Sequence, residues 1–238
     1  MPIQPFEPLD GALLIDKPAG PTSHDVVESI RRQFQIKKVG HCGTLDPNAT
    51  GLLILLLGRA TKLSEKLMSD DKTYAGTMKL GESTDSYDAA GELVASLPVP
   101  PLNLDQLNEL AAAFIGDQMQ TPPMVSAVKI DGVPLYKLAR KGLEVERKPR
   151  LIHIYNFQFS EYQEPLARFA IACTKGTYVR TIAHELGQKV GCGAHLATLR
   201  RLVSGKFDVA DAMPFEDALA LSTAALEKRV IPFLRLAV

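Results

Sequence analysis

A short apolar run bounded by glycines constrains the fold of this chain most. Leu52 to Leu57 places six apolar residues in succession between Gly51 and Gly58. A run of this length fits a strand buried on both faces better than a short helix, although leucine is not a strong strand former. The sequence therefore predicts a central sheet that other elements cover on both sides.

The segment before this strand reads Gly40-His-Cys-Gly-Thr-Leu-Asp-Pro-Asn-Ala-Thr-Gly51 and holds one carboxylate, Asp46. Its three glycines permit backbone angles closed to residues with a Cβ, and Pro47 biases Asp46 away from helical geometry. A carboxylate on a loop anchored to a central strand is typical of an active site. An Asp-Pro pair among glycines is more often only a turn, so the residues alone leave both interpretations open.

Other uses of these motifs meet chemical objections. Asp46 to Thr50 loosely resembles the loop of aspartyl-phosphate phosphatases, but the second carboxylate of that loop must donate a proton, and Asn48 cannot. A calcium loop starting at Asp46 needs a bidentate Glu at its twelfth position, where this chain has Leu57. No Gly-Lys-Ser/Thr follows the glycines, as a phosphate loop requires. His184-Glu185 lacks the second histidine of a zinc helix.

The composition is that of an ordinary globular protein. The 238 residues are 46% hydrophobic and 23% charged, enough for one large domain or two small ones. No run reaches the roughly 18 apolar residues of a membrane span, and the first residues lack the basic start and apolar stretch of a signal peptide. The three cysteines share no Cys-x-x-Cys spacing. We expect a cytoplasmic protein with reduced thiols, no metal and no membrane contact.

Charge is unevenly distributed although the formal net charge is zero. Acidic residues exceed basic ones by seven between Asp70 and Asp117, whereas basic residues exceed acidic ones by seven between Lys129 and Arg201. The densest basic residues, interleaved with Tyr136 and followed by Tyr155, are Lys137, Arg140, Lys141, Arg147, Lys148 and Arg150. This composition suits contact with nucleic-acid phosphates, and it equally suits a solvated helix face.

Periodicity and turn signals predict an irregular alternation of strands and helices. Thr22 and Asp25 form a capping box that starts a helix through Phe34. Further helices are expected at 61–68, 103–116, 135–142 and 177–190, with two short helical pieces after Pro214. Strands are expected at 11–16, 52–57, 73–80, 92–96, 125–130, 150–159, 167–173 and 196–203, with an Asp131-Gly132 turn. Hairpin-like neighbours favour an α+β sheet over a doubly wound one.

The Gly40 to Gly51 segment is similar, without a gap, to the catalytic motif of the TruB family of tRNA pseudouridine synthases, Gly-His-x-Gly-x-Leu-Asp-Pro-x-Ala-x-Gly. The chain resembles the family in further segments, namely Leu14–Gly20, Lys72–Tyr74, Thr121–Lys129, Lys175–Arg180 and Gly191–Arg200. These matches run in order over about residues 10 to 210. Chance does not account for so many motifs in order.

This resemblance implies roles for individual residues. Asp46 corresponds to the catalytic aspartate, and Arg180 to the guanidinium that pairs with this buried carboxylate. Tyr74 corresponds to the active-site tyrosine, whose ring stacks on the extruded uracil and whose hydroxyl is placed for proton transfer. Leu199 closes the other side of the base, and His41 helps to take the place of the flipped base in the RNA loop.

Three more residues are implied with less specific roles. Tyr178 lies in the segment that carries the arginine and is expected to contact substrate. Lys17 and Lys129 are expected to position the backbone or to support the pocket.

The family resemblance also implies a pseudouridine synthase fold, in which a central mixed or antiparallel sheet with flanking helices forms an RNA-binding cleft. It implies isomerisation of uridine 55 in the T loop of tRNA, with the T arm as partner, no cofactor and a monomeric enzyme. Many bacterial members carry an additional C-terminal PUA domain. About thirty residues follow the last motif here, so we expect one catalytic domain over residues 1–238 without a PUA domain. A tRNA-binding folding chaperone without turnover is the alternative, and intact Asp46, Tyr74 and Arg180 oppose it.

Overall fold

The computed structural model describes Glu7, residues 9–126, 128–130 and 132–135, Leu138, and residues 142–143 and 145–236. The chain forms two compact units. Unit 1 is drawn from Met1–Thr73 and Arg200–Val238, and unit 2 from Tyr74–Leu199. Strands β4 (Lys72–Leu80) and β12 (Ala194–Ser204) contain residues of both units.

The sheet of unit 1 is built around β3 (Thr50–Leu57), which contains the apolar run. From Gly51 to Leu57 it pairs antiparallel with β1 (Gly11–Lys17), and it also pairs antiparallel with β2 (Val39–His41). It pairs parallel with β12 at Arg200 and Arg201. Short strands β14 (Met213–Pro214) and β15 (Ile231–Pro232) pair with β1, and β13 (Phe207–Asp208) pairs with β12. Residues 51–57 are all buried, which confirms the predicted strand with two covered faces.

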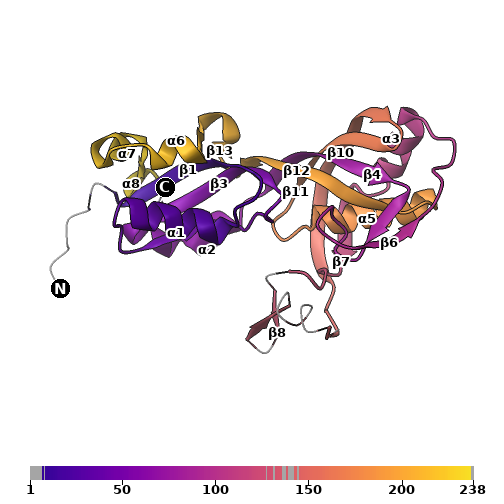
Figure 1. Ribbon diagram of the computed structural model, residues 1–238, viewed down its shortest axis with the longest axis horizontal. Helices are drawn as coiled ribbons and strands as arrows, with labels where there is room; N and C mark the ends of the chain where they lie inside the picture. Colours follow the sequence, from indigo (N-terminus) through magenta and orange to yellow (C-terminus); the bar gives the residue numbers. More distant parts are fainter. Residues whose placement is uncertain are drawn as a thin grey trace. The chain divides into compact units, whose positions relative to one another are not determined.

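Helices surround these strands in unit 1 (Figure 1). Helix α1 (Ser23–Gln33) begins at the predicted capping box, in which Thr22 and Asp25 each accept a backbone hydrogen bond from the other. A 3-10 helix, η1 (Gly58–Leu63), leads into α2 (Ser64–Met68). The C-terminal part has a 3-10 turn η2 (Val209–Asp211) and three short helices, α6 (Phe215–Leu219), α7 (Thr223–Arg229) and α8 (Phe233–Leu236), where two were predicted.

The sheet of unit 2 has the strand order β12-β4-β11-β10-β7. Strand β10 (Arg150–Gln163) lies antiparallel between β11 (Leu166–Cys173) and β7 (Gly116–Gln120). Helices α3 (Leu104–Ala112) and α5 (Val179–Val190) contribute to its core, in which phenylalanine rings meet edge to face. Edge-to-face aromatic pairs add stabilisation beyond that of area burial alone.

Two hairpins complete unit 2. Strands β5 (Glu82–Thr84) and β6 (Leu93–Ser96) enclose an acidic loop, and β8 (Lys129–Ile130) pairs with β9 (Val133–Pro134).

No helix among the described residues is long and apolar enough to cross a membrane.

Several predicted boundaries are wrong. The helix capped by Asn103 ends at Ala112 rather than Gly116, because the N–H groups of Phe114 and Ile115 donate to carbonyls only three residues back. Gly116, with φ +103°, then opens β7, which was not predicted. The strand expected at 125–130 is reduced to the two residues of β8. Gly40 lies in β2 and does not have the positive φ of Gly43 and Gly51.

Two predictions in this part of the chain fall partly outside the described residues, namely the Asp131-Gly132 turn and the helix at 135–142. The α+β class with a mixed sheet and flanking helices is confirmed.

Candidate active site

Asp46 lies in a tight turn between β2 and β3. The backbone N–H of Ala49 donates to the carbonyl of Asp46 at 3.0 Å, and Pro47 occupies the second position of this turn. Proline suits that position because its φ is already fixed near the required value. The Asp46 side chain is half-buried, whereas Pro47 and Asn48 are exposed. The turn therefore presents a carboxylate on a well-defined backbone, as the sequence predicted.

Lys17 anchors this turn from β1. The side chain is fully buried, and its ammonium donates to the carbonyl of Pro47 at 3.0 Å and to that of Pro18 at 2.8 Å. Burial lowers the pKa of Lys17 to about 8, against the opposing influence of the carboxylates of Asp46 and Asp25. Lys17 thus holds the backbone one residue after Asp46 and contributes positive charge that favours the ionised form of Asp46.

A second anchor precedes Asp46. Buried Ser23, at the start of α1, accepts a hydrogen bond from the N–H of Leu45 at 2.9 Å and donates to the carbonyl of Leu45 at 3.1 Å. The backbone is therefore held on both sides of Asp46, by Ser23 before it and by Lys17 after it. Ser23 was not predicted as part of the site, because its partner is 22 residues away in the chain.

Arg201 supports the ends of the same segment. This arginine is 1% exposed, and its guanidinium donates to the carbonyl of Leu52 at 2.7 Å and to that of Gly43 at 3.1 Å. Gly51 lies against the Arg201 backbone, where an added Cβ would stand 2.3 Å from the carbonyl oxygen, and its φ is +96°. Glycine is required here both for backbone angle and for space.

His41 and Cys42 stand at the start of the turn segment. Burial, with smaller contributions from Arg201 and His24, lowers the pKa of His41 below its ordinary value, so the imidazole is neutral at pH 7. Cys42 is fully buried, and burial raises its pKa to about 11. Cys42 is therefore protonated at pH 7 and packs in the core, at a position that the motif leaves variable.

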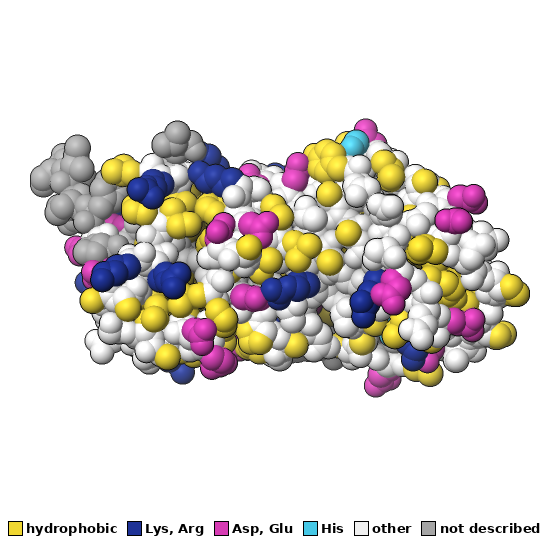
Figure 2. Space-filling view, turned by 90° about the horizontal axis from the view of Figure 1, so that it is seen from above, with side chains coloured by type: hydrophobic (Ala, Val, Ile, Leu, Met, Phe, Trp, Pro, Cys, Tyr) yellow, Lys and Arg dark blue, Asp and Glu magenta, His cyan; other side chains and the backbone are white. Residues whose placement is uncertain are grey.

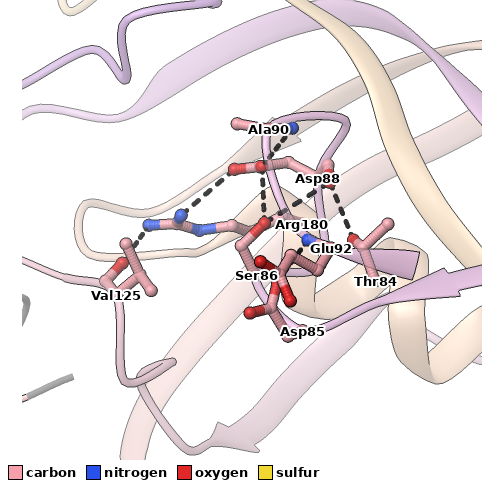
Figure 3. Close-up of polar contacts among 8 residues, drawn as sticks. All are labelled: Thr84, Asp85, Ser86, Asp88, Ala90, Glu92, Val125 and Arg180. Atoms are coloured by element: carbon pink, nitrogen blue, oxygen red, sulfur yellow. Dashed lines mark hydrogen bonds and ion pairs between the residues drawn. The ribbon is translucent and has the colours of Figure 1, made fainter. Parts of the chain in front are cut away.

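Arg180 lies in the first turn of α5 in unit 2 and is 4% exposed. Its guanidinium donates to the carbonyl of Val125 at 2.6 Å and pairs with the carboxylate of Asp88 at 3.2 Å (Figure 3). Asp88 in turn accepts hydrogen bonds from the hydroxyl of Ser86 at 2.7 Å and from the N–H of Ala90 at 3.0 Å. Both ends of the ion pair are therefore oriented by further contacts.

Asp88 was not predicted as a site residue from the sequence. It belongs to the loop that follows β5, within the acidic region between Asp70 and Asp117. The available signal was the short polar run Thr84 to Asp88 after a glycine, but nothing in that run indicates an arginine 92 positions further along the chain.

Tyr178 precedes α5 and is held through its backbone. Its N–H donates to the side chain of Gln120 at 2.7 Å, and the amide of Gln120 donates back to the carbonyl of Tyr178 at 3.1 Å. The Arg180 guanidinium carbon lies 5.7 Å from the centre of the Tyr178 ring. Buried Gln120, on β7, was also not predicted from the sequence.

Tyr74 and Leu199 both pack, partly buried, against the core of unit 2. They lie on β4 and β12, which are neighbours in the sheet. These two strands approach so closely at Gly76 that a Cβ added there would stand 2.4 Å from the carbonyl oxygen of Thr198. An aromatic and an aliphatic side chain are therefore presented by adjacent strands of one unit.

The basic segment is less available to phosphates than its composition suggested. Arg180 and Arg201 are buried, and Arg147 donates to the carbonyl of Pro122 at 3.2 Å. Arg200 forms a two-pronged ion pair with Asp16, at 2.8 and 2.7 Å. Lys148 and Arg150 are exposed. On the face seen in Figure 2, basic side chains are spread among acidic ones rather than gathered in one patch.

Some predicted residues lie outside the part of the chain that the structure describes. Tyr136, Lys137, Arg140 and Lys141 are not among the described residues, and neither is the side chain of Lys129 in β8. No cluster of three or more His, Cys, Asp or Glu suited to a metal ion occurs in the described part of the chain.

The predicted site residues divide between the two units. Asp46, Lys17 and His41 belong to unit 1, and Tyr74, Tyr178, Arg180 and Leu199 belong to unit 2. The pairing of Asp46 with Arg180 remains a prediction.

Family models match the chain in two consecutive parts. Residues 31–179 match the N-terminal domain of the TruB family pseudouridylate synthases, and residues 180–235 match the tRNA pseudouridylate synthase B C-terminal domain.

Curated relatives cover most of the chain. A protein of Opitutus terrae named tRNA pseudouridine synthase B is 56% identical over 97% of this chain and 95% of its own length. A protein of Endomicrobium trichonymphae with the same name is 43% identical over 96% of this chain and 99% of its own.

Solved structures are similar over the same length. The structure of a Cbf5-Nop10-Gar1 complex matches 96% of this chain with a TM-score of 0.76 and 27% identity, and that of an archaeal Nop10-Cbf5 complex matches 96% with 0.71 and 25%. This chain spans 62% and 61% of those solved chains. The family models and the curated relatives establish that the chain belongs to the TruB family of pseudouridine synthases.

Proposed function

We propose that this chain is a tRNA pseudouridine synthase that isomerises uridine 55 in the T loop. The observation that carries the proposal is the unbroken motif from Gly40 to Gly51, folded as an anchored turn that presents Asp46. The 56% identity to a protein named tRNA pseudouridine synthase B supports the substrate class.

The chemistry explains why an anchored carboxylate is needed. The N1 glycosidic bond of uridine breaks, the base rotates, and C5 bonds to C1′ of the ribose. C5 then loses its proton and N1 gains one, so the product is an isomer of uridine. Asp46 starts this sequence by attacking carbon or by removing a proton from the sugar, and both routes require its ionised form. The nearby ammonium of Lys17 favours that form. The reaction changes no oxidation state and adds no group, so we propose that it uses no cofactor and no metal.

The remaining residues receive the extruded base. We propose that Tyr74 stacks on the uracil and transfers a proton, with Leu199 on the opposite face and Tyr178 in contact with substrate. Extrusion costs a few kcal/mol, and stacking on an aromatic ring returns about 1–3 kcal/mol per base.

Further residues stabilise the charge of Asp46, enter the RNA loop or position the backbone. We propose that Arg180 pairs with Asp46 in the reactive state. Neutral His41 is suited to enter the space that the base leaves, because an uncharged ring stacks with less desolvation cost than a charged one. Lys17 positions the backbone, and the same class of role is proposed for Lys129.

We further propose that a single catalytic domain binds the T arm as a monomer in the cytoplasm. Exposed Lys148 and Arg150 are candidates for phosphate contacts.

The test is incubation of the purified chain with a T-arm RNA hairpin in the presence of a chelator, followed by digestion and nucleoside analysis. Pseudouridine has the same mass as uridine, so chromatographic retention identifies the product. Stoichiometric conversion at one position is expected. Binding without conversion would favour a tRNA chaperone, and conversion only after metal is added would contradict the proposed chemistry.

A further inference from the structure

The loop between β5 and β6 contacts α5 at two successive levels. Asp88 pairs with Arg180, and the ring of Tyr87 stacks on His184 with centroids 3.9 Å apart and planes 17° apart. Arg180 and His184 are four residues apart, so they share one face of the helix. One step along the loop therefore corresponds to one turn along α5.

Tyr87 adopts an unusual backbone conformation to make this contact. Its φ is +67°, in the left-handed region that a bulky side chain rarely enters. Glycine or asparagine would adopt it more readily, but neither offers a ring that can stack on His184. A strained backbone held by a specific side-chain contact is characteristic of a segment whose position matters for function.

The partner ring is itself held in place. The amide nitrogen of Gln188 lies 3.0 Å from Nε2 of His184, and we assign the amide as donor and the ring nitrogen as acceptor. Burial lowers the pKa of His184 below its ordinary value, so the imidazole is neutral at pH 7 and stacks as an uncharged ring.

The backbone on both sides of Asp88 is hydrogen-bonded to Leu196 of β12. The carbonyl of Tyr87 accepts from the N–H of Leu196 at 2.9 Å, and the carbonyl of Leu196 accepts from the N–H of Ala89 at 3.0 Å. Asp88 lies between these two bonds. Removing the stack would allow the Tyr87 backbone to relax toward an ordinary φ, and this rotation would move the carboxylate of Asp88 away from Arg180.

We propose that Tyr87 and His184 are positioning residues, which hold Asp88 against Arg180 and thereby fix the guanidinium that the reaction uses. This inference rests on the proposed function, because it assigns the stack an effect on turnover. It concerns neither substrate contact nor the overall fold.

The test separates kcat from KM on a T-arm hairpin. Tyr87→Ala and His184→Ala should each lower kcat roughly tenfold and leave KM within about twofold, because a small displacement of a catalytic group slows chemistry without weakening binding. Tyr87→Phe and His184→Phe keep a stacking ring and should restore kcat to near wild type. His153→Ala removes a half-exposed histidine that contacts Tyr155 and Asp117, away from α5, and serves as the matched control. If an alanine variant does not fold, the corresponding leucine variant replaces it.

A double-mutant cycle tests the route through Asp88. In an Asp88→Asn background, Tyr87→Ala should change kcat by less than about twofold, because the Asp88 carboxylate that Tyr87 positions is already absent. A full second loss in that background, or an unchanged kcat in Tyr87→Ala alone, would overturn the inference while the proposed function stands. Absence of turnover by the wild-type chain would overturn the proposed function and this inference with it.

Discussion

Replacing Gly51 by alanine tests how the Asp46 turn is joined to the sheet. The new Cβ would stand 2.3 Å from the Arg201 carbonyl oxygen and 2.9 Å from its nitrogen, at a φ of +96°. The unusual φ alone costs about 1–3 kcal/mol. Because the clash is with backbone, β3 and β12 must also separate, and we expect a total loss of more than about 3 kcal/mol in the free energy of unfolding.

Two matched variants in unit 1 separate strain from clash. Gly20→Ala meets φ +110° with nothing within 4 Å, so it should cost only about 1–3 kcal/mol. Gly40→Ala has no positive φ and only Thr61 at 3.8 Å, so its effect should stay within about 0.5 kcal/mol. Urea unfolding followed by circular dichroism measures all three. Equal losses at Gly40 and Gly51 would refute the reasoning.

Three further predictions concern charge. Arg180→Ala should abolish most turnover and lower the unfolding free energy by about 3–5 kcal/mol, because it leaves the mostly buried Asp88 carboxylate unpaired; normal turnover and a normal urea midpoint would contradict this. Burial lowers the Lys17 pKa from 10.5 to about 8, so between these pH values the unfolded chain binds a proton that the folded chain does not. The unfolding free energy should therefore rise from pH 8 to 10.5 by at most about 3 kcal/mol, and Lys17→Met should remove this rise; identical pH profiles of urea unfolding would argue against it. Lys148→Ala should lower the log–log salt slope of hairpin binding by about one, with exposed Lys206→Ala as the control; equal slopes would exclude a phosphate contact at Lys148.

Local signals predicted the elements around the Asp46 turn. The apolar run of β3 and the capping box at Thr22 can be recognised from neighbouring residues alone, because a strand buried on both faces and a helix N-terminus both have local sequence patterns. The same holds for the turn at Pro47. Helix α5 begins two residues later than predicted and ends at Val190 as predicted, with Gly191 as its left-handed cap.

Elements that depend on distant partners were not predictable in this way. Strand β7 carries Asp117, Gln118 and Gln120 and has no apolar alternation, and it forms because β10 pairs with it. The burial of Gln120 follows from the backbone of Tyr178, 58 residues away. For the same reason, the sequence does not predict the roles of Asp88, Ser23 and Arg201, because no local pattern identifies their distant partners. The resemblance to a known family, rather than periodicity, supplied the candidate residues of unit 2.

The most direct test of the central claim compares Asp46→Asn with the wild-type chain on one T-arm hairpin. The amide is nearly isosteric with the carboxylate but can act neither as nucleophile nor as base. Pseudouridine formation should fall by at least about a thousandfold, while hairpin affinity stays within a few-fold. Asn48→Ala, at an exposed position of the same turn, should keep wild-type turnover. Turnover by Asp46→Asn within tenfold of wild type would contradict the assignment of Asp46 as the catalytic carboxylate.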